Sequence, residues 1–152
     1  MRTLIVGVAM TGLLLAADHG FAAGEGGTAE EAKAMLERAV AAVEADEAAA
    51  LAAFTAGSDG FRDRDLYVGC SSAADRTVTA HGADSAMVGR NIYELTDAAG
   101  KKFGVEIQAV AAEGEINVVE YVWPRPGETE AVPKETYVTK VSDQVCVVGY
   151  YR

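Results

Sequence analysis

The segment from residue 116 to residue 151 constrains the fold most strongly, because three β-rich runs follow one another there. The runs read Ile-Asn-Val-Val-Glu-Tyr-Val-Trp, Thr-Tyr-Val-Thr-Lys-Val and Cys-Val-Val-Gly-Tyr-Tyr. Pro124, Pro126 and Pro133 cluster between the first two runs and indicate a rigid hairpin loop. Short runs of β-branched and aromatic residues separated by turn residues predict the last three strands of an antiparallel sheet.

A long amphipathic helix is predicted ahead of the sheet, over residues 28–56. Thr28 and Glu31 have the spacing of a capping box at its start. No Gly or Pro interrupts the segment, and apolar side chains recur at helical spacing along it: Leu36, Val40, Val43, Ala50, Leu51 and Phe54. We expect this apolar stripe to pack on a flat partner such as the sheet. The alternative is that the helix pairs with a second copy of the chain.

The middle of the chain completes the predicted sheet. The charged run from Phe61 to Asp65 is interpreted as a solvated connector. Four short elements are then expected, namely strands at 66–70 and 77–80, one helical turn at 91–95 and a second helix at 101–113. The order of the elements predicts an α+β fold with a five-stranded antiparallel sheet in residues 61–152.

Size and charge narrow the classes of protein. A chain of 152 residues favours a single domain. Acidic residues outnumber basic ones by 23 to 13, and the formal charge is −10. Because nucleic acids are themselves densely negative, we predict no nucleic-acid partner.

The N-terminus has the pattern of a secretory signal peptide. Arg2 precedes an apolar run from Thr3 to Ala17, and small residues surround a cleavage position after Ala22. The apolar run is short for a membrane span. We therefore predict a signal peptide at 1–22, a mature domain at 23–152 and a periplasmic or secreted location. The alternative is an uncleaved N-terminal anchor.

Export determines how Cys70 and Cys146 are interpreted. Two cysteines in an oxidising compartment most simply form one disulfide. The sequence contains no Cys-x-x-Cys pair, which leaves a thioredoxin-like site, a paired-cysteine zinc site and covalent haem attachment without support.

No catalytic set is recognisable. The serines lack a Gly-x-Ser-x-Gly motif, and His81 is the only histidine after the predicted cleavage position. A single histidine also makes a zinc site improbable. We predict a protein that is not an enzyme and that needs neither a metal nor a cofactor.

An ordered set of short motifs resembles the Cache family, in particular the single Cache domain of bacterial extracellular sensors. The motifs are Thr79-Ala-His81, Val88-Gly-Arg-Asn91, Leu95-Thr-Asp-Ala-Ala-Gly-Lys101, Glu120-Tyr-Val-Trp-Pro-Arg-Pro-Gly127, Pro133-Lys-x-x-Tyr-Val138 and Val148-Gly-Tyr-Tyr151. The resemblance extends from about Phe61 to the C-terminus. It implies a PAS-like sheet, with a ligand pocket on the face away from the long helix. It also implies that the first and last strands are neighbours, so that Cys70 and Cys146 can meet.

The resemblance gives candidate ligand-binding roles to five residues. Tyr121 and Trp123 lie on one side of a strand and would form a stacking wall, or alternatively core packing. Lys134 would meet a ligand carboxylate, although a lysine there is more often solvated. Tyr137 has the opposite strand parity, so it shares a pocket with Lys134 only if Lys134 lies on a bend. His81 would donate to the ligand or titrate near a pKa of about 6.5; a loop hydrogen bond is the alternative.

Two departures from the family pattern affect the functional prediction. Gly82 stands where a proline commonly follows the histidine, and only Arg152 follows Tyr151. Family sensors usually continue into a membrane helix and a signalling domain, so we expect a free-standing exported form. The predicted function is binding of a small organic ligand, such as a carboxylate, for extracytoplasmic sensing. The alternative is an interaction module that partners a membrane sensor or a second copy, without a ligand.

Overall fold

The computed structural model describes residues 26–152, so the predicted signal peptide lies outside the described residues. The elements, in chain order, are α1 (Ala29–Ala45), α2 (Glu47–Ala56), β1 (Arg62–Asp63), β2 (Leu66–Ser72), β3 (Val78–His81), η1 (Ser85–Met87), η2 (Ile92–Glu94), α3 (Phe103–Val110), β4 (Asn117–Pro124), β5 (Ala131–Val141) and β6 (Gln144–Tyr151). Within this part of the chain, no helix combines the length and apolarity needed to cross a membrane.

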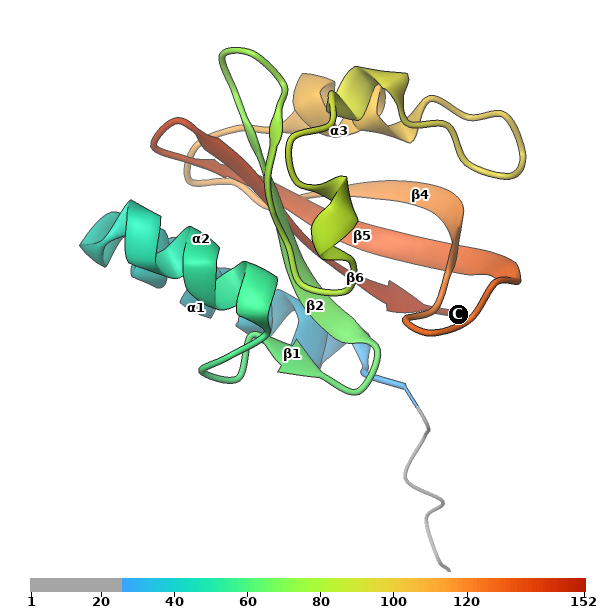
Figure 1. Ribbon diagram of the computed structural model, residues 1–152, viewed down its shortest axis with the longest axis horizontal. Coiled ribbons are helices and arrows are strands. Elements are labelled where there is room, and N and C mark those ends of the chain that lie inside the picture. Colours follow the sequence, from blue (N-terminus) through green and yellow to red (C-terminus); the bar gives the residue numbers. More distant parts are fainter. Residues whose placement is uncertain (1–25) are drawn as a thin grey trace, which may run out of the picture.

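The strands form one antiparallel sheet in the order β1-β2-β6-β5-β4, with β3 also paired to β2. Helices α1 and α2 lie on one side of this sheet, and η1, η2 and α3 lie on the other (Figure 1). The α+β prediction is confirmed. The sheet has six strands where five were expected, because the charged connector contributes β1, in which Arg62 pairs with Tyr67 and Asp63 with Leu66. Arg62 and Asp63 remain exposed, as their charge requires.

The predicted long helix is interrupted at Asp46. This residue adopts an extended backbone (φ −160°, ψ 98°), and its side chain accepts a hydrogen bond from the Ala49 N–H at 3.0 Å. Asp46 therefore ends α1 and caps α2, in keeping with the strong preference of Asp for the position before a helix. The prediction of one continuous helix was wrong at this point. The capping box is confirmed, since Thr28 and Glu31 each bind the other's backbone N–H.

The apolar stripe of the two helices packs on the sheet. Leu36 and Phe54 are fully buried there, against side chains of β2 and β6 such as Val68 and Val148. The expected packing on a flat partner is thus confirmed. Pairing of this stripe with a second copy of the chain is excluded, because the sheet already covers it.

Helix α3 is shorter than predicted and closes the other side of the sheet. It ends at Val110, whose carbonyl oxygen accepts a hydrogen bond from the Asn117 side chain at 2.8 Å. Gly104 lies so close to η2 that an added Cβ would collide with the carbonyl oxygen of Ile92. A glycine inside this helix therefore has a packing purpose, which is the close approach of α3 to η2.

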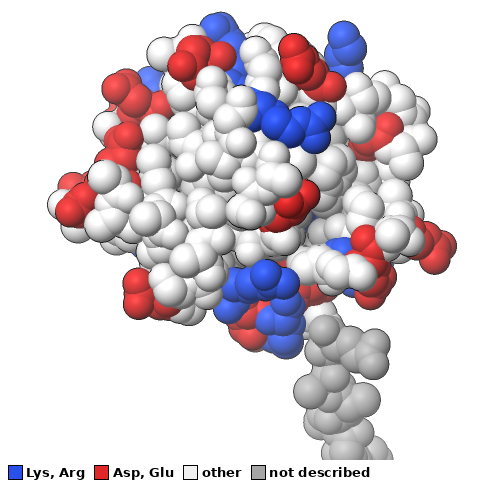
Figure 2. All heavy atoms as spheres, in the orientation of Figure 1, with Lys and Arg blue, Asp and Glu red and all other residues white. Residues whose placement is uncertain are grey.

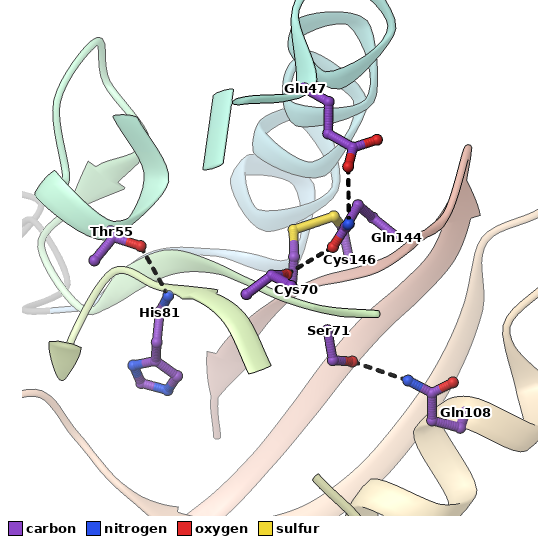
Figure 3. Close-up of a disulfide and its surroundings, with 9 residues drawn as sticks. Glu47, Thr55, Cys70, Ser71, His81, Gln108, Gln144 and Cys146 are labelled. Atoms are coloured by element: carbon purple, nitrogen blue, oxygen red, sulfur yellow. Dashed lines mark hydrogen bonds between the residues drawn. A yellow bond between two sulfur atoms is a disulfide. The ribbon is translucent and has the colours of Figure 1, made fainter. Parts of the chain in front are cut away.

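Cys70 and Cys146 form a disulfide between neighbouring strands. They are direct partners in the β2–β6 register, and their sulfur atoms lie 2.08 Å apart (Figure 3). The bond joins residues 76 positions apart in the chain. Because that loop is long, the cross-link restricts the unfolded chain strongly and should contribute about 4 kcal/mol to stability in the loop-entropy model.

Reduction of this disulfide is expected to lower the free energy of unfolding by up to about 4 kcal/mol. Urea unfolding with and without reductant measures the change. A Cys70→Ala/Cys146→Ala double variant serves as the control, since reductant should leave it unaffected. An unchanged midpoint in wild-type protein whose two thiols are shown by alkylation to be free would contradict this expectation.

Candidate functional site

A small cavity lies on the side of the sheet away from α1 and α2. It has a volume of about 50 Å³ and is lined by strands of the sheet, the η1–η2 segment and α3. Since one water molecule needs about 10–15 Å³ of such space, the cavity holds only a molecule of a few non-hydrogen atoms. Its walls combine aliphatic side chains with a smaller group of aromatic and polar ones: Tyr67, His81, Phe103, Tyr121, Trp123 and Lys134.

Tyr121 and Trp123 form one wall, as their shared strand parity predicted. Phe103 of α3 stacks on Tyr121, with ring centroids 4.2 Å apart and planes 6° apart. The edge of Phe103 also meets Trp123, at 5.1 Å between centroids. The two predictions for these aromatics are therefore compatible, because core packing against α3 holds the rings that border the cavity.

The turn from Asp97 to Lys101 holds this wall from outside the sheet. One carboxylate oxygen of Asp97 accepts the N–H groups of Ala99 and Lys101, at 2.9 and 2.8 Å. The other accepts the Val122 N–H at 3.0 Å, between Tyr121 and Trp123 on the edge strand β4. The same carboxylate therefore also anchors the strand that carries the aromatic wall.

Lys134 is buried in the cavity wall, with only 3% of its surface exposed. It lies beside Tyr121 on β4 and Tyr151 on β6 in the sheet register. Its Nζ donates a hydrogen bond to the Tyr67 hydroxyl at 2.9 Å and lies 4.3 and 4.9 Å from the ring centroids of Tyr67 and Tyr151. The alternative of a solvated lysine is therefore wrong. Gly149 makes this burial possible, because a Cβ there would collide with Lys134 Cε.

The ammonium group of Lys134 lacks a carboxylate partner. Among residues 26–152, no Asp or Glu forms an ion pair with it. Asp65 is near enough to favour its charged form, yet that carboxylate is paired with Arg125 Nε at 3.4 Å and accepts the Gly27 N–H at 2.6 Å. Burial outweighs the attraction of Asp65 and lowers the pKa of Lys134 to about 7.

His81 borders the cavity at the end of β3. Its Nδ1 accepts the Asp84 N–H at 2.9 Å, so the hydrogen of the neutral ring is on Nε2. Burial, assisted by the positive charge of Lys134, lowers the pKa of His81 to about 4. The expectation that it titrates near 6.5 is wrong; at neutral pH it is a neutral donor. The residue after His81 is Gly82. A Cβ atom added there would lie 2.9 Å from the carbonyl oxygen of Phe54, which is too close without a shift of the backbone.

Tyr137 lies on the other side of the sheet, which corrects its predicted place in the site. It packs beside Tyr150, at 6.1 Å between ring centroids, against the core under α1 and α2. Strand β5 is already regular from Ala131, so Lys134 is not on a bend. The difference in parity between Lys134 and Tyr137 therefore separates them completely.

The sequence interpretation missed three aromatic residues of the site. Tyr67 lies on the same side of β2 as Gly69 and Ser71, and this alternation can be recognised in the sequence. Tyr151 is cross-strand partner to Lys134, which only the register reveals. Phe103 is the first residue of α3, and no pattern in the sequence predicts which strand that helix covers.

The site consists of a lysine, a histidine and a set of aromatic and aliphatic side chains around the cavity. In the described part of the chain, no group of three or more His, Cys, Asp or Glu side chains could hold a metal. The site instead combines one buried cation, a neutral histidine donor and a covered apolar cavity. An antiparallel sheet with helices on one side and such a cavity on the other is the arrangement that the resemblance to Cache domains implied.

Comparisons with known proteins establish the family. The model of the family described as Single Cache domain 2 matches residues 23–151, and the chain belongs to this family of sensor domains. No curated protein sequence matches the chain. The fold is shared with a methyl-accepting chemotaxis protein from Vibrio parahaemolyticus, at 21% identity and a TM-score of 0.66, over 80% of this chain and 86% of that one.

Two further structures have the same fold. The periplasmic sensor domain of a chemotaxis protein is 25% identical, with a TM-score of 0.60 over 80% of this chain and 88% of that one. A Cache chemosensory domain described in terms of carboxylic acid recognition is 18% identical, with a TM-score of 0.57 over 80% and 86% of the two chains. These likenesses confirm the expected Cache fold.

Replacement of Lys134 by Met is expected to change how stability depends on pH. The pKa of this lysine is about 7 in the folded chain against 10.5 ordinarily. Between these values the unfolded chain binds more protons at this position, so the wild-type free energy of unfolding rises with pH, by up to about 1.4 kcal/mol per unit. Lys134→Met should lack this rise and exceed the wild type in stability below pH 7. If the free energies of unfolding of the two proteins, measured in urea, changed with pH in the same way, the lowered pKa of Lys134 would be contradicted.

Proposed function

We propose that this domain is an exported sensor module that binds a small carboxylate at Lys134. The observation that carries the proposal is the buried ammonium group without a carboxylate partner among residues 26–152. Burying an unpaired charge is costly, and the Tyr67 hydroxyl and the tyrosine rings compensate for it only in part. A ligand carboxylate would complete the compensation with a charge-assisted hydrogen bond.

The rest of the cavity suits the remainder of such a ligand. His81 offers a neutral N–H donor, which can bind a carboxylate oxygen without an additional charge. Val145, Val147 and the ring of Trp123 supply apolar surface for a short alkyl chain. The volume of about 50 Å³ favours ligands with two or three carbon atoms over longer ones.

Export and sensing are supported from outside the cavity. The N-terminal sequence has the pattern of a secretory signal, and a disulfide is typical of oxidising compartments. One structure of the same fold is described in terms of carboxylic acid recognition by a chemosensory domain. In the present chain, binding would stabilise the folded domain by mass action, as for any ligand of the native state.

Titration calorimetry with propionate tests the proposal, with propionamide as the neutral analogue of equal shape. The wild type should bind propionate and not propionamide, and Lys134→Met should bind neither. Tyr137→Phe is the matched control, because that ring lies on the other side of the sheet; its affinity should equal that of the wild type. Equal binding of acid and amide, or full affinity in Lys134→Met, would overturn the proposal.

The affinity for propionate should also depend on pH in a defined direction. A carboxylate needs the protonated form of Lys134, whose pKa is about 7. The affinity should therefore change little between about pH 6 and about pH 7 and fall above that, by up to about tenfold per unit. An affinity that is unchanged between about pH 6 and about pH 9 would show that this lysine does not bind the carboxylate.

A further inference from the structure

The amine of Lys134 is buried and can act as a nucleophile. An ion pair with a ligand carboxylate does not use this nucleophilic character. Lysines act as covalent nucleophiles toward carbonyl groups when an apolar site favours the neutral amine. Only 3% of the surface of Lys134 is exposed, and its Nζ atom lies beside tyrosine rings rather than carboxylates. An open cavity borders it directly, so a small molecule can reach the nitrogen.

We propose that Lys134 forms a reversible Schiff base with small 2-oxo acids. The inference rests on the proposed function, because the same cavity and the same lysine receive the carboxylate. It adds a covalent step for those ligands that carry a carbonyl group beside the carboxylate. A short acid without a carbonyl would remain bound by charge alone.

The reaction balances without any co-reactant. The neutral amine attacks the carbonyl carbon, the C–N bond forms and the electron pair of the C=O bond moves to oxygen. Starting from the ammonium form, the nitrogen gives up two of its three protons to that oxygen, which leaves as water when the C–O bond breaks. The product is a protonated imine, so the positive charge is retained beside the carboxylate of the ligand.

Two groups in the site are placed to assist this step. The Tyr67 hydroxyl lies 2.9 Å from Nζ and can relay protons between nitrogen and the departing oxygen. His81 keeps a hydrogen on Nε2, because its Nδ1 accepts the Asp84 N–H, and can donate to the ligand. Gly149 leaves the end of the lysine chain unobstructed.

The protonation state of the lysine supports the same conclusion. Its pKa of about 7 leaves a large share of the amine neutral at neutral pH. A solvated lysine with its ordinary pKa has a neutral fraction about 10³-fold smaller. The chain has four other lysines, Lys33, Lys101, Lys102 and Lys140, all of which are more exposed. They provide an internal comparison for any reaction with carbonyl compounds.

Borohydride trapping tests the inference on the wild-type chain. The protein is incubated with pyruvate, reduced with borohydride, and examined by intact mass and peptide mapping. The expected result is a single reduced adduct on Lys134, at least about tenfold more occupied than on any other lysine. Excess propionate should suppress this adduct by competition, and propionate with borohydride alone should give none. Tyr67→Phe should slow trapping while leaving the modified position unchanged.

The outcomes separate this inference from the proposed function. If pyruvate and propionate both bind in calorimetry but no adduct forms on Lys134, the covalent step is overturned and carboxylate binding stands. Adducts distributed over the exposed lysines at equal occupancy overturn it as well. If neither acid binds and no adduct forms, both proposals fail together.

Discussion

Burial of the Lys134 ammonium group is the constraint on which the cavity side of this domain depends. Removing a charge from water is expensive, and three features of the fold reduce the cost: the Tyr67 hydroxyl, the surrounding tyrosine rings and the more distant charge of Asp65. None of them is an anion in direct contact. We propose that this unbalanced charge gives the domain a preference for a negative ligand. The same burial lowers the pKa of Lys134 to about 7.

The two sides of the sheet are packed in different ways. On one side, α1 and α2 bury an apolar core against β2 and β6, and the Cys70–Cys146 disulfide joins those two strands. On the other side, α3 and the η1–η2 segment cover a second buried cluster, against which the partly buried rings of Tyr121 and Trp123 pack beside the cavity. In the orientation of Figure 1, Figure 2 shows acidic and basic side chains mainly toward the edges of the visible surface, with uncharged residues over much of the area between them.

Much of this could be predicted from the sequence because strand and helix patterns are local. The three C-terminal strands, the hairpin at β2 and β3, and the parity of Tyr121 and Trp123 all follow from alternation over a few residues. The interruption of the helix at Asp46 also has a local cause. The helix-favouring composition of residues 28–56 nevertheless predicted one continuous helix, because one residue with a capping preference is a weak signal against it. The resemblance to Cache domains supplied the order of the strands and, with it, the nearness of the two cysteines.

The remaining features of the site depend on long-range register, which no local pattern specifies. Lys134 reads as a solvated lysine until Tyr121 and Tyr151 are known to flank it. Its burial also needs the missing side chain of Gly149, fifteen positions further along the chain. The error over Tyr137 has a related cause, because a difference of one residue along a strand decides which side of the sheet a side chain occupies.

Proton uptake on ligand binding tests the central claim most directly. Calorimetric titration of propionate in buffers of different ionisation enthalpy counts the protons taken up by the complex. With Lys134 at a pKa of about 7 before binding, a bound carboxylate should draw up to about 0.9 proton at pH 8. Uptake of that size in the wild type and in Tyr137→Phe would confirm that the carboxylate meets this lysine. Binding without proton uptake would contradict the account.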